Sequence, residues 1–276
     1  MVSQLSNPRA DRIKALRALT RRAARERTGL FLAEGPQCVR EAIAHTPEDV
    51  RDVYVTAEAR DRLEHLVGAA LAADRPVHEV TPEVLAEFSD ATSPQGIVAV
   101  CRKRAATLDG ILSGAPRLIA VLADVRDPGN AGTVIRAADA FGADAVVLSR
   151  RSVELWNPKV VRSTVGSLFH VPTVVDADID DILSALRTAG MATLAADGAG
   201  TTLLGEVDLA RPHAWILGNE AWGLPEATVA ACDAVVRVPI HGRVESLNLA
   251  MAATVCLYAS SQAPGGGTSV SAPASR

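Results

Sequence analysis

The sequence lacks any apolar run that approaches the roughly 18 residues of a membrane-spanning helix. Its first residues are polar and basic and lack the apolar core of a secretory signal, so we expect a cytoplasmic protein. Neither the histidines nor the cysteines show the paired spacing of a metal site or a disulfide framework, and we predict no bound metal. The four cysteines stand in apolar runs, where we expect buried, reduced thiols: Cys38, Cys101, Cys232 and Cys256.

An overall excess of basic charge is also missing, because the formal net charge of the 276 residues is −4. This average hides a cluster between Arg9 and Arg27, which has eight basic residues against Asp11 and Glu26. Such a cluster is typical of a protein that binds a phosphate backbone, and a solvated helix face is the alternative. We take seven of these residues as candidate RNA contacts: Arg9, Arg12, Lys14, Arg17, Arg21, Arg22 and Arg25.

Residues 1–104 contain short helical and strand-like patterns in alternation. Apolar spacing predicts one amphipathic helix over 9–27, with Gly29 as its C-terminal glycine. Several strand-like runs follow, each separated from the next by a helical pattern, and this alternation predicts a small α/β sandwich domain. Residues 105–116 are rich in small and turn residues and are typical of a linker.

Residues 117–262 alternate more regularly between strand and helix. The strand-like runs are continuously apolar, as expected for parallel strands covered on both faces, and predict a doubly wound sheet. The predicted strands are 117–123, 144–149, 171–175, 191–195, 213–217 and 234–238, with helices at 131–142, 158–168, 178–189, 225–231 and 247–261. The tail, 263–276, cannot bury apolar surface, and we expect it to be disordered.

Three polar segments follow predicted strands of this second region. The first has the pattern N-x-G-x-x-x-R, which is met by Asn130, Gly132 and Arg136. The second is the Gly-Asn-Glu sequence at 218–220. The third has the pattern P-I…S-L-N, which is met by Pro239, Ile240, Ser246, Leu247 and Asn248. Because ligands of doubly wound sheets bind beyond the carboxyl ends of the strands, these segments mark the expected ligand site.

In this order the three segments resemble the three motifs of the SpoU/TrmH family of RNA ribose methyltransferases, within the SPOUT class. Residues 1–104 resemble the L30e-like substrate-binding domain that often precedes the catalytic domain of this family. The resemblance implies an α/β fold in which a small L30e-like sandwich is followed by a C-terminal SPOUT (α/β knot) parallel-sheet domain with a trefoil knot. It also implies transfer of a methyl group from S-adenosylmethionine to a ribose 2′-hydroxyl of RNA.

The resemblance further assigns roles to individual residues. The catalytic set that it implies is Asn130, Arg136, Glu220, Ser246 and Asn248. The cofactor-binding set that it implies is Gly218, Val238, Ile240 and Leu247. Arg136 lies roughly 200° around its helix from the apolar stripe that begins at Val134, so its side chain is predicted to point away from the core. Because a guanidinium does not lose its proton, we expect it to stabilise a developing alkoxide rather than to act as the base.

Structural explanations compete with these roles. Asn130 and Ser246 stand where helix N-caps are expected. At Gly218 the functional interpretation is favoured, because a ligand edge that approaches the backbone there would tolerate no side chain. The Gly129 and Gly132 turn also suggests a dinucleotide-binding loop, but Ser149 and two arginines end the next strand in place of an acidic residue.

Two other functions remain open. A non-catalytic RNA-binding protein of ribosomal type would be expected to have scrambled motifs, and here they are intact. Within the family, 23S ribosomal RNA is favoured over transfer RNA as the substrate, because the extra N-terminal domain is typical of the ribosomal enzymes.

The final predicted helix, 247–261, has apolar or small side chains nearly all round. A helix of this kind must be covered on every face. The sheet can cover only one side, so we expect a homodimer in which a second copy covers the other. Arg136 could then face the partner's cofactor.

Overall fold

The computed structural model describes residues 4–264. The chain divides into two compact units, of which the first comprises Met1–Ala105, Ala131–Arg136 and Val153–His170 and the second comprises the remaining residues. Two segments expected in the C-terminal domain, 131–136 and 153–170, therefore group with the N-terminal residues. No helix between residues 4 and 264 has the length and apolar character needed to cross a membrane.

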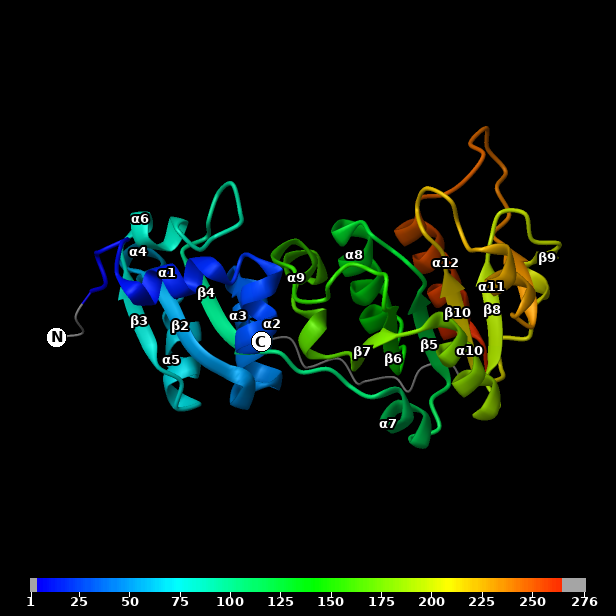
Figure 1. The fold of residues 1–276 in the computed structure, drawn as a ribbon, viewed down its shortest axis with the longest axis horizontal. Helices are drawn as coiled ribbons and strands as arrows, with labels where there is room; N and C mark the ends of the chain where they lie inside the picture. The colour runs from blue at the N-terminus through cyan, green and yellow to red at the C-terminus, as the bar shows by residue number, and fades with distance from the viewer. Residues whose placement is uncertain (1–3, 265–276) are drawn as a thin grey trace. The chain divides into compact units, whose positions relative to one another are not determined.

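A four-stranded mixed sheet forms the centre of the first unit (Figure 1). Its strands are ordered β1 (Leu30–Glu34), β4 (Ile97–Arg102), β2 (Val50–Thr56) and β3 (Val77–Val80), with β4 antiparallel to both of its neighbours. The helices of this unit are α1 (Asp11–Ala18), α2 (Arg22–Thr28), α3 (Pro36–His45), α4 (Ala57–Arg62), α5 (Glu64–Ala72), α6 (Pro82–Ala86) and α9 (Pro158–Thr164), with short 3-10 turns at Pro47–Asp49 and Ser167–Phe169. The α/β character that the alternation predicted is confirmed.

The prediction of one helix over 9–27 was wrong. The chain breaks after α1, where Leu19 is buried in the core and Arg21 takes an extended backbone conformation before α2 begins. The Thr20 hydroxyl donates to the Arg17 carbonyl at 2.8 Å and so satisfies an acceptor at the end of α1. Gly29 ends α2 in the left-handed conformation (φ 66°), as predicted.

Seven parallel strands form the sheet of the second unit. Their order is β7 (Thr173–Ala177), β6 (Ala145–Ser149), β5 (Leu118–Leu122), β10 (His213–Leu217), β8 (Ala192–Ala196), β11 (Ala234–Arg237) and β9 (Thr202–Leu203). The helices are α7 (Leu108–Ser113), α10 (Ile179–Thr188), α11 (Glu226–Ala230), α12 (Leu249–Gln262) and the two ends of α8 (Pro128–Ala140), whose middle, Ala131–Arg136, groups with the first unit, and there is a 3-10 turn at Leu204–Glu206. The parallel sheet confirms the predicted fold class, although the short β9 was not predicted.

The segment predicted as a linker, 105–116, contains helix α7. The Thr107 hydroxyl caps this helix by accepting a bond from the Gly110 amide, and the Ala106 amide donates to the Thr173 carbonyl of β7. Of the tail predicted to be disordered, the residues beyond Pro264 lie outside the described part of the chain.

The four cysteines are free thiols. Cys38, Cys101 and Cys256 are buried as predicted, whereas Cys232 is only partly buried. Burial raises the pKa of Cys256 to about 12 and that of Cys38 to about 11, so both remain protonated at neutral pH.

Candidate active site

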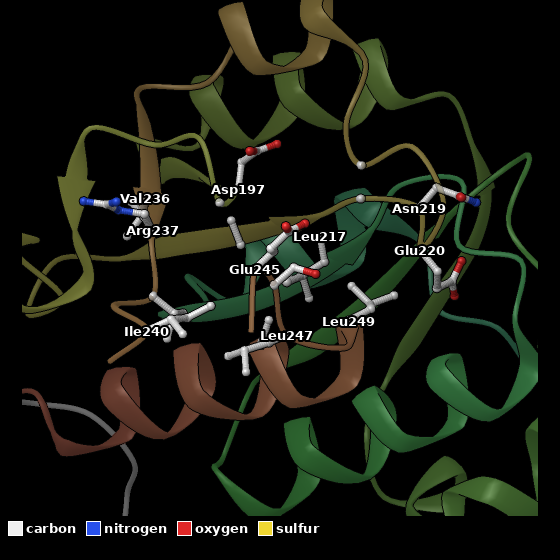
Figure 2. A pocket seen from close by; sticks show the side chains of 17 residues that line it. Asp197, Leu217, Asn219, Glu220, Val236, Arg237, Ile240, Glu245, Leu247 and Leu249 are labelled. Carbon is white, nitrogen blue, oxygen red and sulfur yellow. The ribbon is translucent and has the colours of Figure 1, made fainter. Parts of the chain in front are cut away.

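A cavity of about 390 Å³ lies at the carboxyl ends of three adjacent strands, β10, β8 and β11 (Figure 2). Figure 2 shows Ile240, Leu247 and Leu249 on the side of the cavity next to α12, with Asp197 across from them. The lining residues are Ala196, Asp197, Gly198, Leu217, Gly218, Asn219, Glu220, Gly223, Val236, Arg237, Val238, Ile240, Glu245, Ser246, Leu247, Leu249 and Ala252. The cavity therefore lies where a doubly wound sheet binds its ligands.

The structure brings most of the predicted site residues to this cavity. The four residues predicted to bind the cofactor, Gly218, Val238, Ile240 and Leu247, all line it. Glu220 and Ser246 of the predicted catalytic set line it too. Asn130 and Asn248 are not among the lining residues, and they join the site through hydrogen bonds to Glu220 and to each other. Arg136 is also not a lining residue, and it is exposed on α8, in agreement with its predicted direction.

Glu220 is the centre of a hydrogen-bond network at one end of the cavity. Its Oε1 accepts bonds from the Asp127 amide (3.3 Å) and from Asn130 Nδ2 (3.2 Å), and its Oε2 lies 3.5 Å from the Arg126 amide. The Asn130 Oδ1 in turn accepts a bond from Asn248 Nδ2 at 3.1 Å. One residue from each of the three motifs therefore meets in a single chain of bonds, Glu220–Asn130–Asn248.

The helix caps next to the site differ from the predicted ones. Asp127 caps α8, because its Oδ1 accepts the Asn130 amide at 2.7 Å. Asn248 caps α12, because its Oδ1 accepts the Ala250 amide at 2.9 Å. Neither Asn130 nor Ser246 serves as an N-cap, and the interpretation of these two residues as caps was wrong. The Asn130 side chain is therefore available to the network.

Gly218 lines the cavity, and the loop that it begins also requires a glycine at this position. A Cβ atom at this position would lie 2.5 Å from the Gly223 carbonyl carbon and 2.6 Å from the Leu224 amide nitrogen. The loop from Asn219 to Gly223 is closed by two backbone bonds, Asn219 N to Gly223 O (3.0 Å) and Gly223 N to Asn219 O (2.9 Å). Substitution of Gly218 would thus displace the loop that carries Glu220.

Several residues that build the site were not in the predicted catalytic and cofactor-binding sets. Asp197 and Glu245 line the cavity, where they add two carboxyl groups to that of Glu220. Asn219 is buried, and its Nδ2 donates to the Asp124 carbonyl at 2.7 Å, which holds the Gly-Asn-Glu segment against the residues after β5. Asp197 comes two positions after the predicted strand 191–195 and directly follows β8, and this position near a strand end is the signal that could have identified it.

In the first unit, the basic cluster surrounds a separate hollow of about 940 Å³. It is lined by Asn7, Pro8, Arg9, Lys14, Arg17, Ala18, Thr20, Arg21 and Glu87. Within residues 4–264, Arg9 and Arg21 form no ion pair, and Arg17 pairs with Glu87 at 3.0 Å. Four of the seven predicted RNA contacts therefore share one surface, which we call the basic groove: Arg9, Lys14, Arg17 and Arg21.

Arg25 differs from the rest of the basic cluster. Its side chain is only 2% exposed and is paired with the buried Glu154, and its Nη1 donates to the Leu19 carbonyl at 2.9 Å. A guanidinium held in this way cannot reach a phosphate, so the structure corrects the prediction of Arg25 as an RNA contact. Arg12 and Arg22 remain exposed, and each pairs with an acidic residue of the same unit, Asp52 and Glu26 respectively.

Comparison with known proteins identifies matches over both parts of the chain. The model of the SpoU rRNA Methylase family matches residues 117–258, and the model of the MRM3-like substrate binding domain matches residues 10–99. A 23S rRNA (guanosine-2′-O-)-methyltransferase from Bordetella pertussis is 34% identical over 79% of this chain and 91% of its own length. A 23S rRNA (uridine(2479)-2′-O)-methyltransferase from Streptomyces viridochromogenes is 30% identical over 92% of this chain and 95% of its own. The crystal structure of an rRNA methyltransferase from Sinorhizobium meliloti with bound AdoMet has a TM-score of 0.81 and 28% sequence identity, covering 94% of this chain and 97% of that one.

Proposed function

The chain belongs to the SpoU rRNA methylase family, and from this premise we propose that it transfers a methyl group from S-adenosylmethionine to a ribose 2′-hydroxyl of 23S ribosomal RNA. The observation that carries the proposal is the cavity at the ends of β8, β10 and β11 together with the Glu220–Asn130–Asn248 bonds at one end of it, which join residues of all three motifs. By their names the two relatives both act on 23S rRNA, one on a guanosine and the other on a uridine.

The chemistry of the lining fits S-adenosylmethionine. This cofactor has an apolar adenine face together with ammonium and sulfonium cations and one carboxylate. The cavity offers an apolar wall of Val238, Ile240 and Leu247 and the acidic residues Asp197, Glu220 and Glu245. Its volume is within the usual range for a small-molecule site, about 300–1,000 Å³. When bound, the cofactor supplies an electrophilic methyl group on a sulfonium sulfur.

The residues of the chain then position the ribose and stabilise charge. The attacking 2′-hydroxyl loses its proton as the methyl group is transferred, so negative charge develops on the ribose oxygen. We assign the stabilisation of this charge to Arg136 of the second copy in the proposed homodimer, because Arg136 is exposed and does not line the cavity of its own chain. Its guanidinium stays protonated and therefore cannot be the base. Glu220 holds its carboxylate on the amides of Arg126 and Asp127 and on Asn130, which suits a positioning role.

We assign RNA docking to the basic groove of the first unit. Lys and Arg side chains that neutralise phosphates contribute sequence-independent affinity. Arg9 and Arg21 line this groove and are exposed, so both can approach a phosphate. The match of residues 10–99 to a substrate-binding domain supports this assignment.

We also propose that the protein is a cytoplasmic homodimer with the family's trefoil knot. Supporting the dimer, Met251 (58% exposed), Val255 (38%) and Tyr258 (53%) follow one another at helical spacing along one face of α12. Side chains at such spacing share a face, and an apolar face of this kind is usually covered. Sedimentation tests the proposal, and a monomer at micromolar concentration would contradict it.

A two-part measurement tests the function. Total RNA from cells without the gene is incubated with the protein and methyl-labelled S-adenosylmethionine, and 2′-O-methyl positions are then mapped. We expect one new position in 23S rRNA and none in transfer RNA, and label in transfer RNA alone would overturn the substrate assignment.

Cofactor binding is measured separately by calorimetry. Leu247→Ala removes part of the apolar wall and should weaken binding about 5- to 30-fold, whereas Leu71→Ala, on α5 of the other unit, should not change it. Equal affinity for both variants would place the cofactor elsewhere.

A further inference from the structure

Trp222 is a large aromatic side chain that is exposed beside the active site. It is 55% exposed, whereas the other two tryptophans, Trp156 and Trp215, are 7% and 0% exposed. It lies two residues after Glu220, within the Asn219–Gly223 loop that two backbone bonds close. The Ala221 amide also donates to Asn219 Oδ1 at 2.8 Å, so the residues that present the indole are held in one conformation.

Arg126 lies against this indole ring. Its guanidinium carbon is 5.2 Å from the ring centroid, which is within the range of a cation–π contact. The Arg126 amide also approaches Glu220 Oε2, so the pair is attached to the Glu220–Asn130–Asn248 network. More than half of the indole nevertheless stays exposed, and an aromatic surface beside a fixed cation is thus open to a ligand.

A nucleobase of single-stranded RNA fits this arrangement. Proteins that bind single strands stack bases on aromatic rings and attract the backbone with nearby cations. Sequence-specific RNA recognition likewise uses unpaired bases that stack on aromatic side chains or guanidinium planes. Trp222 offers the ring and Arg126 the charge, and both belong to loops that hold Glu220.

We propose that Trp222 and Arg126 form a stacking site for an unpaired base of the substrate RNA, at or beside the nucleotide whose ribose is methylated. This inference rests on the proposed function, because it takes RNA as the ligand of the neighbouring cavity. It adds a base-contacting site that orients the RNA strand next to the Glu220–Asn130–Asn248 network.

Tryptophan fluorescence tests the stacking without any methyl transfer. Because Trp156 and Trp215 are buried, acrylamide should quench mainly Trp222 in the RNA-free protein. A ten-nucleotide single-stranded RNA should quench the same emission, and the Trp222→Phe variant should lack this component. An abasic oligonucleotide of the same length and charge is the control, and we expect it to quench far less because it has no base to stack. Equal quenching by both oligonucleotides would overturn the proposal.

Shielding of Trp222 in the RNA-free protein is the second informative outcome. If acrylamide cannot reach this residue at concentrations where the protein is dimeric, a second copy of the chain covers it. That result would also overturn the proposal.

Steady-state methylation separates this inference from the proposed function. Trp222→Ala should raise the KM for RNA about 5- to 150-fold, Trp222→Tyr should restore most of the loss, and the Kd for S-adenosylmethionine should stay unchanged. A wild-type KM in Trp222→Ala would refute the stacking site and leave the function intact. Base-dependent quenching by a protein that methylates no RNA would refute the function and leave the stacking site intact.

Discussion

Replacement of Arg25 by alanine should strongly destabilise the first unit. The side chains of Arg25 and Glu154 are 2% and 8% exposed, and Arg25 also donates to the Leu19 carbonyl. In Arg25→Ala, the Glu154 carboxylate stays buried without its partner and the carbonyl loses a donor. Breaking a buried ion pair on one side costs about 3–5 kcal/mol, so we expect the free energy of unfolding of this unit to fall by that amount.

Urea unfolding followed by circular dichroism and by hydrogen exchange in α2 measures this loss. Exchange is needed because a chain of two units need not unfold in one step. With a urea dependence of about 1–3 kcal/mol per M, the midpoint of the first unit should fall by at least about 1 M.

Arg22→Ala is the matched control, because Arg22 and its partner Glu26 are 62% and 52% exposed and such a pair contributes about 1 kcal/mol or less. A double variant, Arg25→Met with Glu154→Leu, should recover most of the stability, since apolar residues can replace a buried pair. If Arg25→Ala unfolds like Arg22→Ala, the buried Arg25–Glu154 pair does not stabilise this unit. The original prediction of an RNA contact would then be restored.

Three further predictions concern RNA, catalysis and pH. Arg21→Ala in the basic groove should lower the slope of log RNA affinity against log salt concentration by about 0.7–0.9. Arg60→Ala is the control and should leave the slope unchanged, because Arg60 lies outside the groove and is paired with Glu79 at 3.0 Å. An unchanged slope for Arg21→Ala would show that the groove is a solvated face that does not bind RNA. Asn130→Ala should lower kcat about 10- to 100-fold, because Asn130 positions Glu220 and Asn248. The Kd for S-adenosylmethionine should change little, because Asn130 does not line the cavity. An unchanged kcat would contradict this positioning role. Burial lowers the pKa of His213 from its ordinary value of 6.5, so below that pH the unfolded chain binds a proton that the folded chain does not, and stability falls as the pH drops. His213→Asn should reduce this loss in urea unfolding between pH 7 and pH 5, and His241→Asn should not.

The elements of the second unit could be predicted because continuous apolar runs of five residues become parallel strands when both faces are covered. The predicted strand 213–217 coincides with β10, and the motifs lie at strand ends because ligand sites of such sheets form there. The cofactor-binding set was predicted from the family resemblance, and two of its members, Gly218 and Val238, directly follow β10 and β11 in the structure.

The role of Arg25 could not be predicted from its local pattern. Its partner, Glu154, is 129 positions away in the sequence, and no periodicity relates the two residues. In the sequence Arg25 belongs to the basic cluster between Arg9 and Arg27, so charge alone groups it with Arg21 and Arg22. Tertiary contacts decide which arginine of such a run is buried, and the same argument explains why the break between α1 and α2 was missed.

The N-cap of α8, unlike the burial of Arg25, has a local signal in the sequence. Proline is favoured at the first position of a helix, so Pro128 indicates Asp127 as the N-cap of α8 rather than Asn130. The shift of three positions has a functional consequence. An Asn130 side chain that capped the helix would be bonded to backbone amides of its own first turn, whereas here it reaches Glu220 and Asn248 instead. Asn248 performs both tasks, because its Oδ1 caps α12 and its Nδ2 donates to Asn130. The cap of α12 thus orients the amide that joins the first and third motifs, and replacing Asn248 with aspartate would keep the cap but remove that donor.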